Sequence, residues 1–298
     1  MDQYIKDFEN LRKHPHTVQS MTRKGNSIVK FASNVERLKT KNRLNISFDD
    51  VLSDPDKYLS MPSAQKLYIT ERYVRHRSHT ASMEIVTKLY LGGIPGYFKP
   101  STAAYFLSKY RPKVAVLDPT MGWGGRLIGA AAVDVPKYIG IDSNVNLESG
   151  YRDILSIIQK KTAADVHLIF RDALKVDYSM LEYDVVLTSL PYFNRERYAN
   201  QVERTDAVWI QEFYHPLIIS VWNSLKEGGH MLLNVDRKTY EEAIVPVLGS
   251  SDSVEPILRQ AKFNKVPATN KGDSQVENMY IWTKPPKKVE RLYADPTF

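Results

Sequence analysis

The stretch Val116–Arg126, VLDPTMGWGGR, places a short aliphatic run directly before an aspartate, a proline and a cluster of glycines. The run from Val114 to Leu117 predicts a buried strand, because it is short, apolar and not alternating. Glycines at this point predict a sharp turn in which the backbone approaches a ligand closely. The turn leads into a predicted helix from Gly122 to Ala132. The stretch has neither the GxGxxG spacing of dinucleotide folds nor the Lys-Ser/Thr of a phosphate loop, and a glycine loop alone is weak evidence of binding.

Two further acids follow predicted strands. Asp142 comes directly after the strand Tyr138–Ile141, and Asp172 closely follows the strand Val166–Phe170. In open α/β sheets, ligands collect beyond the carboxyl ends of the strands. A carboxylate at Asp142 can accept hydrogen bonds from both hydroxyls of a ribose, and it can also cap the following helix. Together with Asp118, these acids outline a nucleoside site without a phosphate clamp.

Predicted strands and helices continue to alternate along the rest of the chain. Further strands are predicted at 185–187, 230–235 and 279–283, with helices at 147–160, 213–225 and 240–248. This alternation predicts an α/β protein with a doubly wound, mostly parallel sheet and right-handed crossovers. Residues 1–90 have a mainly helical pattern, and the glycine cluster at 92–96 indicates a boundary. We therefore expect a basic, mainly helical region at 1–90 that recognises substrate, an α/β domain at 91–284 and a C-terminal tail at 285–298.

The glycine stretch and the acids resemble those of class I S-adenosylmethionine-dependent methyltransferases, over roughly residues 96–284. Asp118-Pro119 with Gly122 and Gly124 is similar to the first motif of that family, although Trp123 and Gly125-Arg126 depart from its commoner form. Tyr97–Ser101 resembles the motif that closes over the cofactor. The resemblance implies a seven-stranded Rossmann-like sheet and S-adenosylmethionine as cofactor. The implied cofactor-binding residues are Phe98, Lys99, Asp118, Pro119, Gly122, Trp123, Gly124, Asp142 and Asp172.

A second motif, TSLPYF at 188–193, follows the buried run at 185–187. It resembles the (Asp/Asn/Ser)-Pro-Pro-(Tyr/Phe) motif of methyltransferases that act on exocyclic amino groups of nucleobases. Such a nitrogen attacks poorly because its lone pair is delocalised, so hydrogen-bond acceptors must offset the charge that develops on it. The resemblance implies Ser189 Oγ and the Leu190 carbonyl as acceptors, Pro191 as a stiffener and Tyr192 as a stacking platform for a flipped base. The alternative is an ordinary turn with a proline after a strand.

The charge predicts a polyanionic partner. The formal net charge is +7 and the isoelectric point is near 9.2, a balance that suits nucleic acid and also fits a merely basic protein. Basic residues alternate with aromatics in RYVRHR at 72–77, as phosphate contacts and base stacking require. The expected nucleic-acid contacts are Arg72, Arg75, Arg77, Phe193, Arg195 and Arg197.

The composition excludes several chemistries. The chain has no cysteine, which removes disulfides, thiolate catalysis and cysteine-ligated metal centres. Its histidines show no metal-ligand spacing, so we expect no metal. It has no apolar run long enough to span a membrane and no apolar signal peptide, so we expect a cytoplasmic protein without membrane contact. The resemblance suggests a phage or virus source.

The resulting main hypothesis is methyl transfer to the exocyclic amino group of a base in DNA, at N6 of adenine or N4 of cytosine. The cofactor motif precedes the amino-group motif, as in the γ arrangement of these enzymes. Leu190 replaces the first proline of the motif, as an aliphatic residue does in rRNA adenine dimethylases, so an RNA N6-adenine methyltransferase is the alternative. An alternative of another class is a non-catalytic, nucleic-acid-binding partner subunit. The sequence leaves the oligomeric state open.

Overall fold

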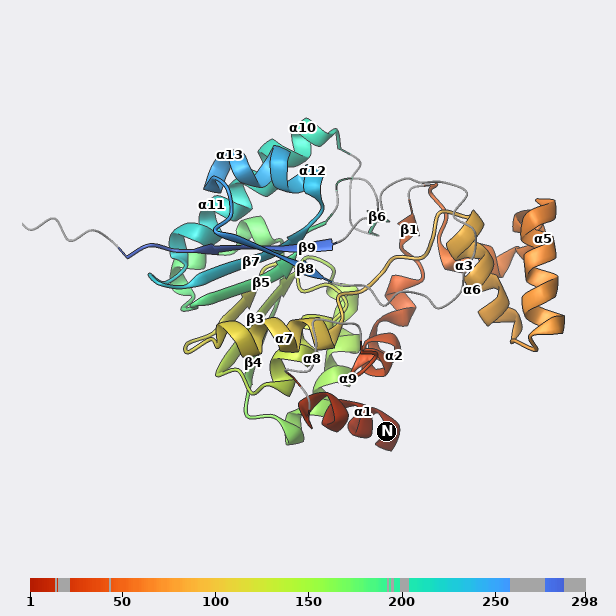
Figure 1. The fold of residues 1–298 in the computed structure, drawn as a ribbon, viewed down its shortest axis with the longest axis horizontal. Helices are drawn as coiled ribbons and strands as arrows, with labels where there is room; N and C mark the ends of the chain where they lie inside the picture. Colours follow the sequence, from red (N-terminus) through yellow and green to blue (C-terminus); the bar gives the residue numbers. More distant parts are fainter. Residues whose placement is uncertain are drawn as a thin grey trace, which may run out of the picture.

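A seven-stranded sheet forms the centre of the protein (Figure 1). The computed structural model describes residues 1–13, 15, 22–42, 44–191, 193, 196–198, 204–257 and 277–286, with the backbone alone at 196, 197 and 277. The strand order is β4-β3-β2-β5-β7-β9-β8. The strands are β2 (Val116–Asp118), β3 (Lys137–Asp142), β4 (Asp165–Phe170), β5 (Val185–Ser189), β7 (His230–Val235), β8 (Ser253–Ile257) and β9 (Glu277–Thr283).

The pairing of the strands makes the sheet mostly parallel. Strands β4, β3, β2, β5 and β7 are parallel, and β9 runs antiparallel between β7 and β8. This confirms the expected doubly wound, mostly parallel, seven-stranded Rossmann-like sheet. The sequence did not predict β8, an edge strand. Pro256 lies within it, where its missing N–H is tolerated because the strand has a neighbour on one side only.

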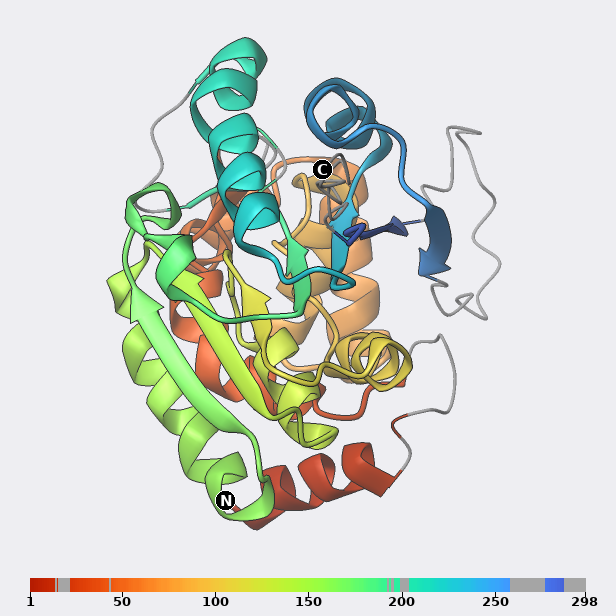
Figure 2. The ribbon, with the colours of Figure 1, turned by 90° about the vertical axis from the view of Figure 1, so that its left-hand side faces the viewer.

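Helices cover both faces of the sheet (Figures 1 and 2). One face carries α1 (Asp2–Lys13), α2 (Asn26–Arg37), α7 (Pro100–Tyr110), α8 (Gly125–Ala132) and α9 (Glu148–Ile158); the other carries α10 (Asp206–Trp209), α11 (His215–Ser224), α12 (Arg237–Thr239) and α13 (Val245–Leu248). Successive residues of the central strands alternate between the two cores: Val116 belongs to the first, and Leu117 to the second. Burial on both faces explains why central strands such as β5 and β7 contain continuous apolar runs.

The N-terminal region divides into two parts. Helices α1 and α2 insert Phe8, Leu11, Ile28 and Val29 into the first core of the sheet. A separate core joins α3 (Phe48–Ser53), α4 (Pro55–Tyr58), α5 (Pro62–Ile69) and α6 (His79–Tyr90). We call residues 44–91 the helical lobe. The mainly helical extension is thus present, but its first two helices pack as part of the α/β body, a division that the range 1–90 does not make.

A two-stranded ribbon joins the lobe to the rest of the protein. Strand β1 (Lys41–Asn42) pairs antiparallel with β6 (Glu196–Arg197), and the ribbon lies between the sheet and the lobe (Figure 1). The buried side chain of Asn42 donates hydrogen bonds to the carbonyl oxygens of Leu91 at 2.7 Å and Gly93 at 2.9 Å. It therefore ties the entry of the lobe to its exit, at the glycine cluster that the sequence marked as a boundary.

The described part of the chain contains three π-helical turns: η1 (Thr70–Val74) at the end of α5, and η6 (Ile210–Tyr214) and η7 (Tyr240–Ile244) within longer helical segments. The last two each end two residues before a proline, Pro216 and Pro246. A proline has no N–H, and its ring clashes with the carbonyl four residues earlier, so a widened turn before it relieves both problems. Short 3-10 turns are present at η2 (Val145–Leu147), η3 (Gln159–Lys161), η4 (Ala173–Lys175) and η5 (Tyr178–Met180).

Candidate active site

Two loops meet at the carboxyl edge of the sheet. The glycine loop, residues 119–126, follows β2, and the acceptor loop, residues 188–193, begins at the end of β5. Because β2 and β5 are adjacent parallel strands, both loops emerge at the same place. The Thr120 hydroxyl lies 3.1 Å from the Ser189 carbonyl oxygen and donates to it, which joins the loops directly. The structure thus brings together the two motifs that lie far apart in the sequence.

The Asp118 carboxylate is fully buried at the base of the glycine loop. Its Oδ2 accepts hydrogen bonds from Arg126 Nε and from the Tyr138 hydroxyl, each at 2.7 Å, and its Oδ1 accepts one from the Thr188 hydroxyl at 2.9 Å. A buried ion pair is stable only when such additional bonds satisfy its charges. The sequence predicted a cofactor contact at Asp118; the structure directs its carboxylate at these protein donors, where it holds the loop.

Arg126 extends this cluster to the segment that precedes the sheet. Its guanidinium donates to the Thr120 carbonyl and lies over the Phe98 ring, 5.2 Å from the centroid. Burial lowers the pKa of Arg126, but the neighbouring Asp118 carboxylate more than compensates and raises it. Burial, together with Asp118, also raises the pKa of Tyr138 well above its ordinary value. Arg126 therefore remains charged and Tyr138 remains a neutral donor.

Asp142 joins the end of β3 to the glycine loop. Its Oδ2 accepts a hydrogen bond from the Gly122 amide and its Oδ1 accepts one from the Asn144 amide, both at 2.9 Å. Burial raises the pKa of Asp142 against the opposing effect of these two bonds. Each carboxylate oxygen can accept a second hydrogen bond. The residue can thus brace the loop and accept hydrogen bonds from a ribose, while Asn144 caps the short helix that follows.

Glycine is required in the loop for close packing. A Cβ on Gly125 would lie 1.8 Å from the Phe98 carbonyl oxygen, and one on Gly124, where φ is +83°, would lie 2.3 Å from Ile154 Cδ1. The sequence predicted close backbone approach to a ligand at this turn. At Gly124 and Gly125 the close approach is to the protein itself, and it fixes the loop against α9 and the Phe98 segment.

The other expected cofactor residues lie around this loop. Pro119 and Trp123 are buried, Phe98 packs against the first core and Lys99 precedes the first residue of α7. Asp172 is half-buried and its Oδ1 accepts a hydrogen bond from the Leu174 amide at 3.0 Å, which caps a 3-10 turn. The structure therefore gives Asp172 a local capping contact beside its expected role.

The first half of the acceptor loop rests on the glycine loop. Thr188 and Leu190 are buried, whereas Ser189 and Pro191 are half-buried. The Thr120 hydroxyl lies 2.7 Å from Thr188 Oγ1 and also within reach of the Ser189 carbonyl. Since Thr188 gives its own proton to Asp118, the single Thr120 proton is shared between two acceptors. A chain of hydrogen bonds thus runs from Asp118 to the Ser189 backbone.

The second half of the acceptor loop contacts the opposite helical layer. The buried Tyr214 hydroxyl donates to the Pro191 carbonyl and accepts from the Phe193 amide at 3.1 Å. Phe193 has a φ of +44°, is 7% exposed and packs with its ring centroid 5.2 Å from that of Tyr214. The sequence predicted a nucleic-acid contact at Phe193, whereas the structure packs its ring in the second core. Tyr192 and Arg195 lie outside the described residues, and only the backbone of Arg197 is described, in β6.

Two of the three arginines of the helical lobe pair with one acid, and the third contacts the backbone of one of them. Glu71 is buried; Arg75 NH1 lies 2.7 Å from its Oε1, and Arg77 Nε lies 2.7 Å from its Oε2. Arg72 donates to the Arg77 carbonyl at 3.0 Å. The side chains of Arg75 and Arg77 are 56% and 48% exposed, so the cluster faces solvent. Glu71 organises the arginines and offsets one of their three charges.

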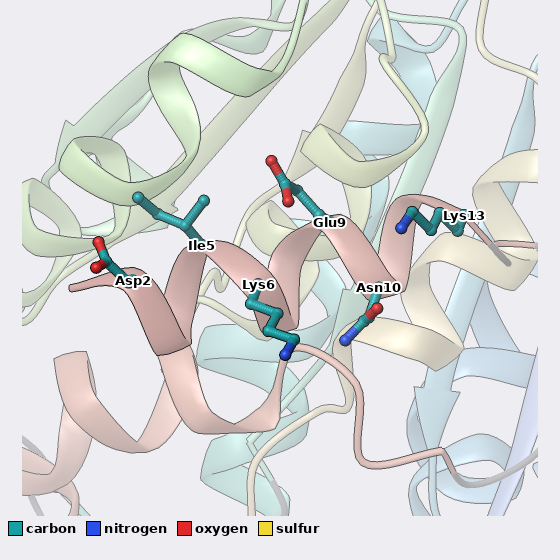
Figure 3. A pocket seen from close by; sticks show the side chains of 6 residues that line it. All are labelled: Asp2, Ile5, Lys6, Glu9, Asn10 and Lys13. Carbon is teal, nitrogen blue, oxygen red and sulfur yellow. The ribbon is translucent and has the colours of Figure 1, made fainter.

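A surface hollow of about 480 Å³ lies along α1 (Figure 3). Its lining consists of Asp2, Ile5, Lys6, Glu9, Asn10 and Lys13. Acidic and basic side chains are balanced there, and Glu9 pairs with Lys161 at 2.8 Å. The hollow therefore offers no net charge to a ligand and contains none of the residues predicted from the motifs.

The described part of the chain offers neither a metal site nor a membrane-spanning helix. No group of histidine, aspartate and glutamate side chains there could hold a metal ion. Among the helices of the same residues, none combines the length and apolar character needed to cross a membrane.

The sequence missed the polar groups that support both loops. Thr120, Thr188, Tyr138 and Tyr214 each donate or accept a hydrogen bond that fixes a loop. Arg126 was visible only as a departure from the commoner motif, yet an arginine within the apolar helix GRLIGAAA needs a buried carboxylate partner. The proline after the η6 turn was the one signal near Tyr214.

Comparisons with known proteins gave no match by sequence and distant matches by structure. No protein-family model matches the sequence, and no curated protein matches it. A SAM-dependent O-methyltransferase from Thermotoga maritima is similar in structure, with 15% identity, a TM-score of 0.44 and coverage of 66% of this chain and 69% of that one. TrmN from Thermus thermophilus is 14% identical, with a TM-score of 0.42 and coverage of 67% and 53%. An rRNA methylase from Streptococcus thermophilus is 14% identical, with a TM-score of 0.38 and coverage of 58% and 87%.

Proposed function

We propose that the protein transfers a methyl group from S-adenosylmethionine to the exocyclic amino group of a base in nucleic acid. The observation that carries the proposal is the contact between the two loops. The acceptor loop, with Ser189 and Leu190, is hydrogen-bonded to the glycine loop through Thr120 and Thr188. A cofactor held at the glycine loop and a base held at the acceptor loop would therefore lie side by side, which is what direct transfer requires.

On the cofactor side, Asp142 would accept hydrogen bonds from the ribose hydroxyls. Asp118 would act through Arg126, by holding the glycine loop in shape. The remaining cofactor contacts would come from Phe98, Lys99, Pro119, Gly122, Trp123, Gly124 and Asp172. When bound, S-adenosylmethionine supplies an electrophilic methyl group on a sulfonium. The binding site is braced before the ligand arrives, so little reorganisation is needed when charge develops.

On the target side, Ser189 Oγ and the Leu190 carbonyl would accept hydrogen bonds from the two amino hydrogens. These bonds would strengthen as the nitrogen gains positive charge on accepting the methyl group that the cofactor would supply, and the methylated nitrogen would then release one proton to solvent. Pro191 would restrict the turn, and Tyr192 would stack on the base. A base in a duplex must be flipped out to reach such a site.

The preferred substrate is DNA, at N6 of adenine or N4 of cytosine. The net charge of +7 and the arginine cluster of the lobe support a polyanionic partner. Leu190 in place of a proline supports the second candidate, an RNA N6-adenine methyltransferase. A non-catalytic partner subunit would bind cofactor or nucleic acid at the same edge without transfer.

Labelled cofactor distinguishes these functions. The protein is incubated with labelled S-adenosylmethionine and separate DNA and RNA pools, which are then digested to nucleosides. We expect labelled N6-methyladenine or N4-methylcytosine from DNA. Label from RNA alone would establish the second candidate, and cofactor binding without any labelled product would establish the partner subunit.

A serine variant tests the acceptor role. Ser189→Ala should slow single-turnover transfer by about 100-fold while leaving nucleic-acid affinity unchanged, since the bond matters mainly in the transition state. Ser156→Ala is the matched control, because the Ser156 hydroxyl is exposed and bonds only within α9. A Ser189→Ala protein with the wild-type rate would remove Ser189 from the mechanism.

Salt dependence tests the arginine cluster. Arg72→Gln should reduce the slope of log affinity against log salt by about 1, as expected for one lost phosphate contact. Arg72 is the informative choice, because removing Arg75 or Arg77 would deprive the buried Glu71 of a partner. Arg152→Gln, at an exposed arginine of α9, is the control. An unchanged slope would assign Arg72 to an ordinary solvated surface.

A further inference from the structure

We infer that the Tyr214 hydroxyl is a positioning group that sets the conformation of the acceptor loop and thereby the placement of Ser189 and Leu190. The inference rests on the proposed function for its effect on transfer, although the contact itself does not. Tyr214 comes from the π-helical turn η6, twenty-one residues beyond the last residue of the loop. Its hydroxyl contacts the backbone on both sides of position 192.

One oxygen atom joins two backbone groups of opposite character. The hydroxyl donates its proton to the Pro191 carbonyl and accepts the proton of the Phe193 amide. Both groups must therefore converge on a single point, which restrains the backbone at Pro191 and at Phe193. The φ of +44° at Phe193 is a left-handed conformation that a phenylalanine adopts only where its surroundings hold it. The hydroxyl bond to its amide is one such restraint.

The tyrosine ring is itself held rigidly. Its centroid lies 5.2 Å from that of Phe193, 5.5 Å from that of Phe213 and 5.9 Å from that of Trp209, and the side chain is fully buried. The η6 turn ahead of Pro216 places Tyr214 at the last widened position, and such π turns occur frequently at functional sites. The packing of the ring therefore fixes the position of the hydroxyl.

The two ends of the acceptor loop are held by different neighbours. Thr120, in the glycine loop, holds the Ser189 carbonyl, and Tyr214, in the opposite layer, holds Pro191 and Phe193. Removing the tyrosine hydroxyl would release the second end and leave the glycine loop unchanged. Transfer should therefore slow while cofactor affinity stays the same, a separation that a general loss of stability would not produce.

The test compares Tyr214→Phe with Tyr183→Phe. Both tyrosines are fully buried in the second core, and the Tyr183 hydroxyl donates to the Val221 carbonyl of α11 at 2.7 Å, so each variant loses one buried hydroxyl. Hydrogen exchange of the Phe193 amide should accelerate at least about tenfold in Tyr214→Phe, since its acceptor is gone, and stay unchanged in Tyr183→Phe. Single-turnover transfer should fall about 10- to 100-fold in Tyr214→Phe only, with unchanged cofactor affinity.

The outcomes separate the two proposals. Unchanged exchange of the Phe193 amide in Tyr214→Phe would overturn the inference, whatever the activity. Faster exchange with an unchanged transfer rate, or an equal loss of transfer in Tyr183→Phe, would overturn the positioning role. If the wild-type protein transfers no methyl group to any nucleic acid, the proposed function fails, and amide exchange alone then decides whether Tyr214 holds the loop.

Discussion

The glycine loop and the acceptor loop lie at the same sheet edge but are held by different chemistry. The glycine loop is braced by charged groups: Arg126 with Asp118 at its base and Asp142 at its tip. The acceptor loop is held by neutral hydroxyls, from Thr120 on one side and Tyr214 on the other. Charged buried contacts are costly to break, whereas a neutral hydrogen bond contributes only about 1 kcal/mol. The proposed cofactor side is thus the more rigid part, and the proposed target side the more easily altered one.

The largest effect is expected at the base of the glycine loop. Arg126→Met leaves the Asp118 carboxylate buried without its cation, so the free energy of unfolding should fall by about 3–5 kcal/mol. Urea unfolding measures this loss. Arg152→Met removes an exposed arginine from an ion pair whose side chains are 67% and 53% exposed, and it should cost less than about 1 kcal/mol. Similar losses of unfolding free energy in the two variants would mean that the buried Arg126–Asp118 pair contributes no more to stability than an exposed ion pair.

At the tip of the same loop, Asp142→Asn should weaken S-adenosylmethionine binding by roughly 1.5–3 kcal/mol per charge-assisted hydrogen bond lost. Calorimetry measures the affinity. Asp153→Asn, at an exposed residue of α9, provides the control. Equal affinities in wild type and Asp142→Asn would remove Asp142 from the cofactor site and leave it only a bracing role.

The raised pKa of Asp142 adds a pH dependence with a definite sign. Because the folded state holds this proton more tightly than the unfolded state, the stability contribution of Asp142 falls as pH rises from the ordinary aspartate pKa to the raised one. Cofactor affinity should change in the opposite direction, since the ionised carboxylate is the better acceptor. Affinity should therefore drop as pH falls through the raised pKa, and Asp142→Asn should lack this step. A step that persists in the variant would assign the titration to another group.

The packing of the glycine loop predicts a smaller loss. Gly125→Ala brings a Cβ against the Phe98 carbonyl, which is backbone and cannot move aside easily. Overpacking of this kind should cost about 1–3 kcal/mol of stability and lower cofactor affinity as the loop shifts. Gly96→Ala is the control, since no atom lies within 4 Å of its added Cβ. Thermal unfolding with and without cofactor measures both the stability and the cofactor affinity. If Gly125→Ala changed neither, the loop would be able to shift and accommodate the added Cβ.

The smallest effect should come from the neutral link between the loops. Thr120→Val removes the hydroxyl that contacts Thr188 and Ser189, at a cost of about 1 kcal/mol. Thr70→Val loses a hydroxyl bond within its own helical turn instead. A larger effect of Thr120→Val on the transfer rate than on cofactor affinity would support the contrast between the glycine loop and the acceptor loop. A loss of cofactor affinity as large as that in Asp142→Asn would contradict this contrast.

The sequence predicted the sheet well because its signals are local. Continuous aliphatic runs such as 185–187 mark strands buried on both faces. Strand β8, an exposed edge that contains Pro256, lacks such a run. The division of residues 1–90 was also not predicted, because the apolar faces of α1 and α3 look alike until their partners are known.

The site was predicted only in part, for a related reason. The motifs locate Asp118, Asp142 and Ser189 at strand ends, but they do not show that Asp118 faces Arg126 and Tyr138. Tyr214 lies in a separate helical turn, and its contact with the acceptor loop depends on how that turn packs. Such contacts arise from the tertiary arrangement, and no spacing in the sequence encodes them.

The Asn42 side chain has a consequence for modularity. It holds the first residues of the helical lobe beside its last ones, through the carbonyl oxygens of Leu91 and Gly93. The lobe has its own core, so it has the topology of an inserted domain whose two junctions nearly coincide in space. Exchange of residues 44–91 for another small domain with adjacent termini would leave the sheet and both loops covalently intact. The surface of the lobe and the two loops at the sheet edge could then change independently within one chain.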